Sequence, residues 1–586
     1  MEKMKIGFIV RGKDNSAKSL YVKDGQLCFG GNYDNDSIVT AYVANGLGFL
    51  TSRKRVIDIV RILPANDGVA ICSILNRKYL SSNPSKLDRA EGVAFNKVKI
   101  DSWETFKVLP LNSNPTWLDA YFEIVHNHNT TLAFDLIEEG VEIEIPILTF
   151  LLTCHPKKLI DTELAKRIQK PKFLDCLLKI AGGNYLITPL LVSLTQKHRH
   201  SSPIKIGVDR DIYGRVPDVR NPWLIINSAL RRLIKKTSKC CIVATARNEG
   251  IYIVEWVAYH LLLGFDKIFL YTNNNQDESL DLLREMHELG LIQLIESDVG
   301  SGGNAQVKAY SHALLALPEV SSHEWCAFID VDEFITYDKH KFLSLSDYLD
   351  WVGGTGADVI ALSWVLAANP ITSNDWIEQP VTIRNRKASP FQSNLIKCIV
   401  RPESAVTSGP HYPISTTGCE LVAVNAERTR YISERSDTPT DITKCQSPTF
   451  NNAYLYHYEL KSFPELIWKY SRNRGNYSAI TEDICLNDQF LSRIGHFRKC
   501  IERENSPNIE LAVNSEALSH TISDFMTKGR MNILLDRVRE ATRQRYDKLL
   551  AHLPHHLEHN IDRENPYDIS AANWIESEFI LHSKTT

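Results

Sequence analysis

The sequence predicts a multidomain protein built around an α/β domain with a doubly wound, mostly parallel sheet. From Cys240 onward, strand-like and helix-like segments alternate four times within about 90 residues. Before them, residues 1–111 show short β-branched runs between turn-rich segments, and residues 112–236 show apolar residues at three- and four-residue spacing. The helical spacing returns in 479–586. We therefore expect an all-β domain, a helical linker domain, the α/β domain at 237–478 and a helical C-terminal extension.

The composition is that of an ordinary globular protein of 586 residues, of which 43% are hydrophobic and 23% charged. Lys and Arg number 67 and Asp and Glu 70, so the formal net charge of −3 argues against nucleic acid as the main partner. The 12 Cys include no CxxC pair, which argues against a zinc ribbon or a disulfide scaffold. Because no apolar stretch reaches about 20 residues and no signal-peptide core is present, we expect a cytoplasmic protein.

The all-β region contains the runs IGFIV, SIVTAYVA, VIDIVRIL and VAICSIL, separated by segments such as GGNYDND and PANDG. Its most informative segment is Val69–Leu111, where KYL is followed by a stretch ending in WETF. This segment resembles one lobe of a β-trefoil of the fascin kind, on Tyr79, Leu80, Ala94, Trp103, Glu104 and Phe106. The resemblance implies a module that binds a glycan or a partner. The alternative is an unrelated small β-barrel in which Trp103 and Phe106 are core residues.

The helical region from 112 to 236 contains no motif that carries chemistry. It ends in the basic stretch NSALRRLIKKTSK, with Arg231, Arg232, Lys235 and Lys236. We expect a solvated helix face here. Contact with an anionic membrane surface or an anionic acceptor is the alternative, and it would make the protein peripheral at the inner face of a membrane.

In the α/β domain the strands are CCIVAT, KIFLYT, LIQLIES and WCAFIDVDEFI, and a helical segment follows each of the first three. Polar residues stand where strands end: Arg247, Asn248 and Glu249 after the first, Asn273 and Asp277 after the second, and Asp330, Asp332 and Glu333 after the fourth. Ligands bind doubly wound sheets at the carboxyl ends of the strands, so these side chains are expected to converge.

Asp330 and Asp332 interrupt an apolar run, with Ile329 before them and Phe334 after them. Residues i and i+2 of an extended segment point to the same side, and two adjacent carboxylates repel each other unless a cation lies between them. Mg²⁺ or Mn²⁺ would relieve that repulsion and would complete its shell with water and substrate phosphates. The sequence therefore predicts a divalent-cation site that bridges a diphosphate.

Two segments, TARNEGIYIVEWVAYHLLLGFDKIFLYTNNNQDES and WCAFIDVDEFI, resemble glycosyltransferases of the GT-A fold, of the family 2 and family 92 type. Ordered similarity continues through Gln306 and Tyr310, Trp364, NLIKCIVRPE, His411 and YLYHYELKSFPELIWKYSRNRG, up to Gly475. The resemblance implies a Rossmann-like GT-A domain. It departs at LAANP, from Leu366 to Pro370, a stretch that faces the acceptor in the family.

What the resemblance implies for single residues falls into three groups. Nucleotide binding is expected of Arg247, Glu249, Asn273, Asp277, Asp330, Lys461 and Arg474. Metal binding is expected of Asp330, Asp332 and His457, with Mn²⁺ or Mg²⁺ as cofactor. An inverting transfer also needs a general base, for which Glu333, Asp375 and Glu378 remain candidates that spacing does not separate. Glu249 could instead serve the first helical turn, and His457 could be a core histidine.

The first hypothesis is a metal-dependent glycosyltransferase of the hexosyltransferase type, acting in surface polysaccharide synthesis. It would move a sugar from a nucleotide donor, with a UDP-sugar favoured, to a glycan or lipid-linked saccharide. The alternative is a sugar-binding or scaffold protein with a degenerate transferase domain, and a nucleotidyltransferase ranks last because ATARNEG lacks the glycine density it needs. The C-terminal helices are expected to pack on the domain or to form a homo-oligomer contact.

Overall fold

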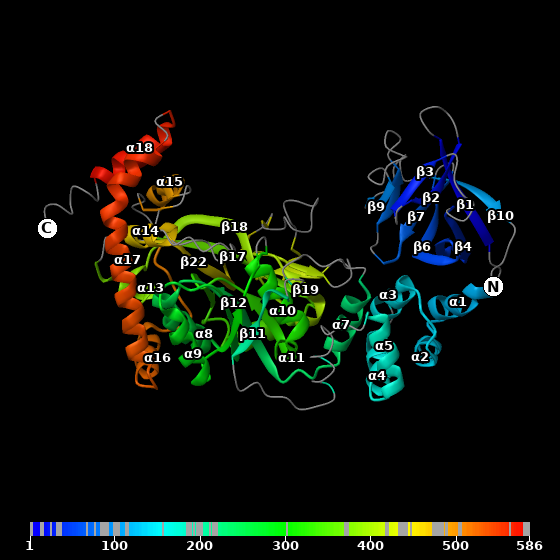
Figure 1. Ribbon diagram of the computed structural model, residues 1–586, viewed down its shortest axis with the longest axis horizontal. Coiled ribbons are helices and arrows are strands. Elements are labelled where there is room, and N and C mark those ends of the chain that lie inside the picture. Colours follow the sequence, from blue (N-terminus) through cyan, green and yellow to red (C-terminus); the bar gives the residue numbers. More distant parts are fainter. Residues whose placement is uncertain are drawn as a thin grey trace. The chain divides into compact units, whose positions relative to one another are not determined.

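The computed structural model divides into two compact units (Figure 1). The first comprises 1–197, 217–234 and 415–420, and the second comprises 198–216, 235–414 and 421–586. The structure describes residues 4–11, 17–23, 26–30, 38–65, 68–75, 78–82, 93–97, 106–111, 116–154, 157–182, 190, 194, 203–209, 213, 221–300, 303–368, 374–415, 421–431, 444–445, 448–471, 486, 490–501, 507–561 and 564–577.

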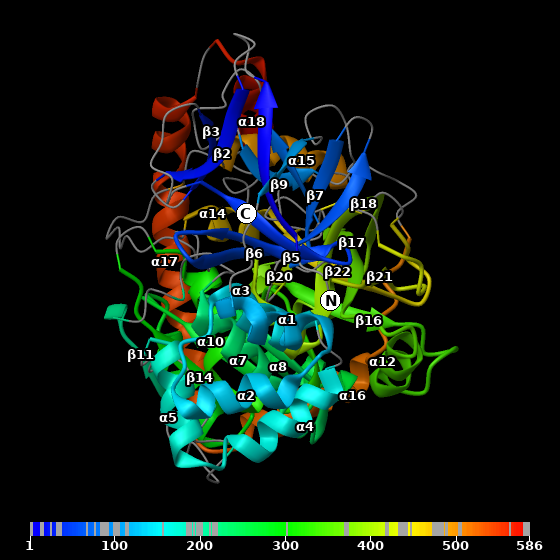
Figure 2. The ribbon, with the colours of Figure 1, turned by 90° about the vertical axis from the view of Figure 1, so that its right-hand side faces the viewer.

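The first unit contains a ten-stranded sheet with the order β3-β2-β1-β4-β5-β6-β7-β8-β9, in which β10 also pairs with β1 (Figure 2). The pairings between these strands are antiparallel, as expected for strands that can be joined without crossover helices. The strands are β1 Met4–Arg11, β2 Ala17–Lys23, β3 Gln26–Gly30, β4 Thr40–Ala44, β5 Leu47–Ser52, β6 Arg55–Ala65, β7 Gly68–Ser73, β8 Tyr79–Ser82, β9 Val93–Lys97 and β10 Lys107–Leu111.

The described residues of this region that form regular structure are strands, and Phe106 lies in the core of their sheet. Leu80 and Phe106 are 0% and 1% exposed and belong to one apolar cluster with Leu50 and Ile71. The lobe that resembles a trefoil forms strands β7 to β10 in part, whereas Trp103 and Glu104 lie outside the described residues. The trefoil itself stays a prediction.

Helices make up the rest of the first unit, as the three- and four-residue spacing predicts. They begin and end at ordinary signals: Asn129 accepts a hydrogen bond from Leu132 N at 3.0 Å at the start of one, and Gly140, with φ 87°, ends it. The helices are α1 Asp119–His126, α2 Thr130–Glu139, α3 Ile145–Cys154, α4 Lys157–Arg167, α5 Pro171–Ile180 and α7 Pro222–Arg232, with the 3₁₀ turn η4 Thr116–Leu118.

The solvated basic face expected at 231–236 is wrong. Arg231 is 0% exposed, and Arg232 donates to the Asp161 carboxylate at 3.0 Å. Lys236 donates to Glu403 at 2.7 Å, and of the four cations only Lys235 is exposed. A run of charged residues is exposed when water solvates the side chains. Here, residues from distant parts of the sequence pair with two of them, Arg232 and Lys236. An exposed basic face at 231–236 was the reason to consider contact with a membrane, so the structure removes that reason.

The second unit contains a ten-stranded mixed sheet with the order β11-β14-β13-β12-β15-β18-β17-β22-β16, and β21 pairs with β17. The five strands from β11 to β15 are parallel, since helices α8, α9 and α10 connect most of them as crossovers. Beyond β15, β18 pairs antiparallel with β15 and β17, β17 pairs parallel with β22, and β22 pairs antiparallel with β16, so the mostly parallel sheet is found only in this first half.

The strands of the second unit are β11 Ile204–Ile206, β12 Ser238–Ala246, β13 Lys267–Thr272, β14 Gln293–Ser297, β15 His323–Phe328, β16 Glu333–Tyr337, β17 Val359–Ala368, β18 Ala388–Val400, β19 Ala405–Ser408, β20 Pro413–Ser415, β21 Ala423–Asn425 and β22 Ala453–Lys461. The helices are α8 Gly250–Leu263, α9 Ser279–Glu288, α10 Ala305–Ala316, α11 Pro318–Ser321, α12 Leu345–Gly353, α13 Val381–Arg384, α14 Phe463–Ser471, α15 Phe490–Ile501, α16 Ser515–Met526, α17 Met531–Asn560 and α18 Pro566–Ile575, and η6 Asn374–Ile377 and η7 Pro402–Ser404 are 3₁₀ turns.

The sheet is covered on both faces. Alternate residues of β12 enter different cores: Ile242 packs with Trp256 of α8, and Val243 packs with Tyr310 of α10. Helices α16 and α17 lie against α8 and α9 (Figure 1), where Leu518 of α16 is 2% exposed in the first of these cores. Across the described residues, no helix has both the length and the apolar character needed to span a membrane.

Candidate functional site

The acidic turn 330–332 joins β15 to β16 at the carboxyl edge of the parallel strands. Ile329 and Val331 are 1% and 3% exposed and anchor the turn in the core, so the intervening acids are held at its edge. The Asp330 side chain keeps 37% of its surface, and that of Asp332 keeps 12%. On the next strand, β22 places His457 opposite Glu333. The turn is therefore a fixed feature rather than a solvated loop.

Asp330 is held by one amide and one lysine. Gln306 of α10 donates to Asp330 Oδ1 at 2.9 Å and also to the Tyr310 hydroxyl at 2.9 Å. Lys397 of β18, which is 1% exposed, donates to Asp330 Oδ2 at 2.7 Å and lies 3.4 Å from Glu333 Oε2. Burial tends to lower the pKa of Lys397, but the two carboxylates raise it above its usual range. Lys397 is therefore a permanent buried cation.

Asp332 contacts a different set of cations. Lys469 of α14 donates to Asp332 Oδ2 at 2.8 Å, Lys461 Nζ lies 4.0 Å from the same oxygen, and His457 Nε2 lies 3.5 Å from Oδ1. Burial would raise the pKa of Asp332, but Lys469 and His457 hold it well below its ordinary value. The carboxyl group is therefore ionised at neutral pH.

Glu333 supports the turn from inside. It is 0% exposed, and its Oε2 accepts a hydrogen bond from Asp330 N at 2.8 Å. Burial raises the pKa of Glu333 to about 8, although Lys397 opposes the rise. A carboxyl group without exposed surface does not reach an acceptor hydroxyl in this conformation, so the geometry favours a role in positioning Asp330 over a role as general base.

Lys461 lies at the end of β22 in a left-handed backbone conformation, with φ 48°. Its ammonium group lies 4.5 Å from the centroid of the Tyr252 ring, and burial lowers its pKa. The next residue, Ser462, donates through its amide and its hydroxyl to Glu465 at 3.1 and 2.6 Å. Arg384 holds the same carboxylate with two hydrogen bonds of 2.5 and 2.6 Å. A buried ion pair thus fixes the turn that presents Lys461.

The loops after β12 and β13 are tied to each other. Asn248 Oδ1 accepts from Gln276 N at 2.7 Å, and Asn275 Oδ1 accepts from Asn248 N at 3.0 Å. Asp277, expected to contact the nucleotide, is 1% exposed and accepts hydrogen bonds from Gly250 N at 2.9 Å and Ser279 N at 3.2 Å. Its oxygens therefore satisfy the amide groups of two helix N-termini.

Three other expected nucleotide ligands lie near these loops. Arg247 is 5% exposed at the end of β12, and burial lowers its pKa. Glu249 is the N-cap residue of α8 and adds to the electrostatic environment of Lys461. Asn273 is 9% exposed, and its amide nitrogen has no hydrogen-bond partner within the described part of the chain. A buried amide donor of this kind is suited to a ligand carbonyl.

The other predicted residues are less central. Glu378 is exposed and forms ion pairs with Arg539 and Arg543 of α17. Asp375 lies in η6, and its side chain is outside what the structure describes, as is the whole of Arg474. His411 Nδ1 donates a hydrogen bond to Ile396 O at 2.8 Å, and burial lowers the pKa of the ring to about 4.

The donors around Asp332 fit a divalent ion that a substrate helps to hold. Asp332 Oδ1 and His457 Nε2 are 3.5 Å apart and face each other, and the Trp364 ring lies 4.3 Å from the His457 ring. Among the residues that the structure describes, no group of three or more His, Cys, Asp or Glu side chains forms a preformed metal cage. Mg²⁺ and Mn²⁺ commonly bind one or two protein groups plus water and phosphates, so two protein ligands suffice.

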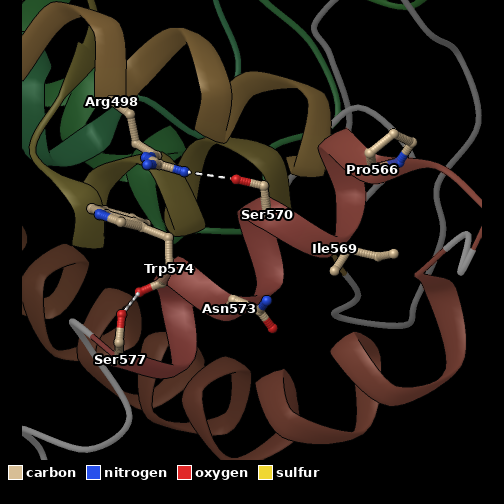
Figure 3. Close-up of a pocket in the computed structure, with 7 residues that line it drawn as sticks. All are labelled: Arg498, Pro566, Ile569, Ser570, Asn573, Trp574 and Ser577. Carbon is tan, nitrogen blue, oxygen red and sulfur yellow. Dashed lines mark hydrogen bonds between the residues drawn. The ribbon is translucent and has the colours of Figure 1, made fainter.

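A hollow of about 600 Å³ lies elsewhere, between α15 and α18 (Figure 3). Its polar groups bond to each other: Arg498 donates to the Ser570 hydroxyl at 3.1 Å, and Ser577 donates to Trp574 O at 3.1 Å. It shares no residue with the cluster around Asp330 and Asp332, so it is not the nucleotide site.

Sequence reasoning missed Lys397 and left Lys469 out of the site. Both lysines lie in segments that were quoted for the resemblance, NLIKCIVRPE and FPELIWKYSRNRG, yet neither was assigned a role. A signal for Lys397 existed, because a lysine between Ile396 and Cys398 interrupts a strand that is otherwise apolar and buried.

Residues 239–475 match the model of glycosyltransferase family 92. A family 92 protein of Ricinus communis is 32% identical over 25% of this chain and 26% of its own length, and one of Oryza sativa subsp. japonica is 27% identical over 26% and 24%. The chain thus spans about a quarter of the length of these relatives.

Among solved structures, S. aureus TarS 1-349 aligns at 12% identity over 59% of this chain and 92% of its own, with a TM-score of 0.21. Glucosyl-3-phosphoglycerate synthase from Mycobacterium tuberculosis aligns at 12% identity over 35% and 67%, with a TM-score of 0.17. Scores this low carry no argument about the fold, and what the comparisons establish is a similarity: residues 239–475 are similar to glycosyltransferase family 92.

Proposed function

We propose that the second unit is a metal-dependent glycosyltransferase that takes its sugar from a nucleotide donor, with a UDP-sugar favoured. The acceptor would be a glycan or a lipid-linked saccharide. The observation that carries the proposal is the cluster of three lysines, Lys397, Lys461 and Lys469, around two aspartates at the carboxyl edge of the parallel strands. Similarity to family 92 supports the reaction class.

The charges of the cluster suit a diphosphate. Each lysine is at most a quarter exposed, and the three lysines outnumber the two aspartates that they contact. Desolvated cations that are already positioned stabilise the charge that develops on a leaving phosphate without reorganisation. The cluster is therefore built for an anionic ligand.

Asp332 and His457 would hold the divalent ion, and the bound ion would neutralise charge on the leaving diphosphate. Lys461 and Lys469 hold the Asp332 carboxylate ionised and in place. Gln306 and Lys397 orient Asp330, whose partly exposed side chain is available to a donor hydroxyl. Asn273 offers an unpartnered amide donor to the base or ribose.

Nucleotide binding tests this proposal directly. Thermal unfolding is measured with UDP, GDP and CMP, each with and without Mn²⁺, because a ligand of the folded state alone raises the melting temperature. We expect the largest rise with UDP and Mn²⁺ together. Asp332→Asn should remove the Mn²⁺-dependent part of the rise while leaving an ordinary unfolding transition.

Asp281→Asn is the matched control, since Asp281 is an acid of α9 with 58% exposure that forms a surface ion pair with Arg284. It should behave as the unsubstituted protein. The proposal is refuted if no nucleotide shifts the melting temperature, or if Asp332→Asn keeps the full Mn²⁺ effect.

A sugar-binding protein with a degenerate transferase domain predicts a different result. It would bind glycan without releasing nucleotide from any nucleotide-sugar, and Asp332→Asn would not change that binding. A screen of donors by released nucleotide separates the two proposals.

A further inference from the structure

Exposed histidines gather on the last turns of α17, outside the region that matches family 92. His552, His555 and His559 are all exposed there, at spacings of three and four residues. Residues at this spacing share one face of a helix. The fourth histidine of the segment, His556, is only half-buried and stacks edge-on against Phe490, with ring centroids 6.4 Å apart, so it belongs to the packed side.

His555 and His559 are the pair that the geometry brings together. Their rings are nearly parallel, at an interplanar angle of 15°, and their centroids are 4.0 Å apart. Two imidazoles at positions i and i+4 of a helix can bind one metal ion from the same side. No ion pair or packing partner competes for this face among the contacts of the two rings that the described residues show.

A backbone hydrogen bond fixes the tautomer of His559. Its Nδ1 lies 2.9 Å from His555 O. A carbonyl oxygen only accepts, so Nδ1 must carry the proton, and in the neutral ring Nε2 keeps the lone pair. Metal-binding histidines typically donate their second ring nitrogen to a carbonyl or carboxylate in this way. The neutral His559 ring therefore keeps the Nε2 lone pair for coordination, and a rotation of the stacked rings about their side-chain bonds would direct both imidazoles at one ion.

Imidazole pairs select the ion. Nitrogen ligands suit Zn²⁺, Cu²⁺ and Ni²⁺, whereas Mg²⁺ and Mn²⁺ favour oxygen ligands. Since no third metal-binding side chain joins a group within the described chain, water would complete the shell. We infer that His555 and His559 form a surface site for a borderline divalent transition-metal ion, distinct from the Mn²⁺ or Mg²⁺ site at Asp332.

Because the two histidines lie near the C-terminal end of α17, a bound ion would also affect the order of that helix end. Pro554 lies inside α17, directly before His555, and lacks the N–H that would close the preceding turn. The helix ends at Asn560. An ion that bridges His555 and His559 would hold the final turn of α17, which follows the turn that Pro554 weakens, and so metal binding and the order of the helix end are coupled.

Isothermal titration of the metal-stripped full chain with ZnCl₂ tests the site. We expect binding that falls by about tenfold or more in His555→Gln and in His559→Gln, since each variant loses one of two ligands. His520→Gln, which changes an exposed histidine on α16, should leave binding unchanged. MnCl₂ at the same concentration should not compete.

Two spectroscopic readouts separate this site from other metal binding. Cu²⁺ should bind more tightly than Zn²⁺ and show nitrogen hyperfine structure that disappears in the double variant His555→Gln/His559→Gln. Hydrogen exchange should slow at residues 556–560 when Zn²⁺ is added. Equal Zn²⁺ affinity in the double variant, or no binding up to about 1 mM Zn²⁺, overturns the inference. Because the residues are exposed and distant in sequence from Asp332, nucleotide-dependent stabilisation should survive in every variant.

Discussion

Removing one member of the buried Arg384–Glu465 pair should destabilise the second unit strongly. The two side chains are 8% and 1% exposed, and Glu465 accepts four hydrogen bonds, two from Arg384 and two from Ser462. Glu465→Gln leaves the Arg384 charge buried without its partner. Burial would raise the pKa of Glu465, and Arg384 now lowers it, so Arg384→Met leaves the buried carboxylate with only Lys461 and the two hydrogen bonds from Ser462.

The magnitude follows from desolvation. Breaking a buried ion pair by removing one partner costs about 3–5 kcal/mol, because the remaining charge stays out of water. For a unit of this size, about 2 °C per kcal/mol implies a fall of roughly 6–10 °C in melting temperature. The double variant removes both charges, so its cost should fall short of the sum of the single costs by about 2 kcal/mol or more.

Differential scanning calorimetry of the four proteins measures this cycle and resolves units that unfold separately. Lys528→Met and Asp524→Asn provide a matched control cycle, since that i,i+4 pair is about half exposed and should contribute less than about 1 kcal/mol. Single variants that lose less than about 1 kcal/mol, or costs that simply add, would refute the reasoning. A second readout is nucleotide binding, which should weaken in Glu465→Gln because that variant changes the carboxylate to which Ser462, the neighbour of Lys461, donates.

Gly250→Ala should lower the melting temperature by an amount equivalent to about 1–3 kcal/mol, because the added Cβ would lie 2.6 Å from a side chain of α17. Gly495→Ala should raise the melting temperature, because its Cβ would meet nothing within 4 Å and alanine favours the helix α15. Calorimetry that shows a shift of the same sign for both variants would contradict this reasoning. His260 is fully buried, and burial lowers its pKa to about 3, so the unfolded state binds its proton first and stability is lost as pH falls from about 6.5 towards 3. Urea unfolding at pH 7 and pH 4.5 should therefore differ by about 2–3 kcal/mol less in His260→Phe than in the unsubstituted protein, and an unchanged difference would exclude His260 as a source of acid sensitivity. Lys397→Met should reduce the rate at which nucleotide is released from the nucleotide-sugar donor by about 100-fold, because Asp330 loses the cation that orients it. A variant that keeps more than half the activity of the unsubstituted protein would show that this contact is dispensable.

Much of the architecture follows from local pattern. The four strand-and-helix alternations from Cys240 yield the parallel half of the sheet, because a strand followed by a helical crossover returns in parallel. The acidic turn is found where an apolar strand ends, and its neighbours Ile329 and Val331 are buried as their spacing indicates. The all-β character of 1–111 follows in the same way from alternation and turn residues.

The partners of the acidic turn depend on tertiary structure. Lys397 is 67 residues from Asp330 in sequence, and Lys469 is 137 residues from Asp332. Such pairs depend on the register of β18 and β22 in the sheet, which no local pattern encodes.

The same distinction explains the expectations that failed or changed. The local sequence predicts that Arg231, Arg232 and Lys236 are exposed. It does not indicate that Arg232 pairs with Asp161 and Lys236 with Glu403, because these partners are distant in sequence. Asp277 stays a predicted nucleotide ligand, but folding gives its carboxylate a contact that the sequence does not indicate, a hydrogen bond from Gly250 N. Sequence alone therefore determined the secondary structure and the edge of the sheet where polar residues gather. Only the tertiary structure decided which charges meet there, because a buried charge takes its properties from neighbours that the fold supplies.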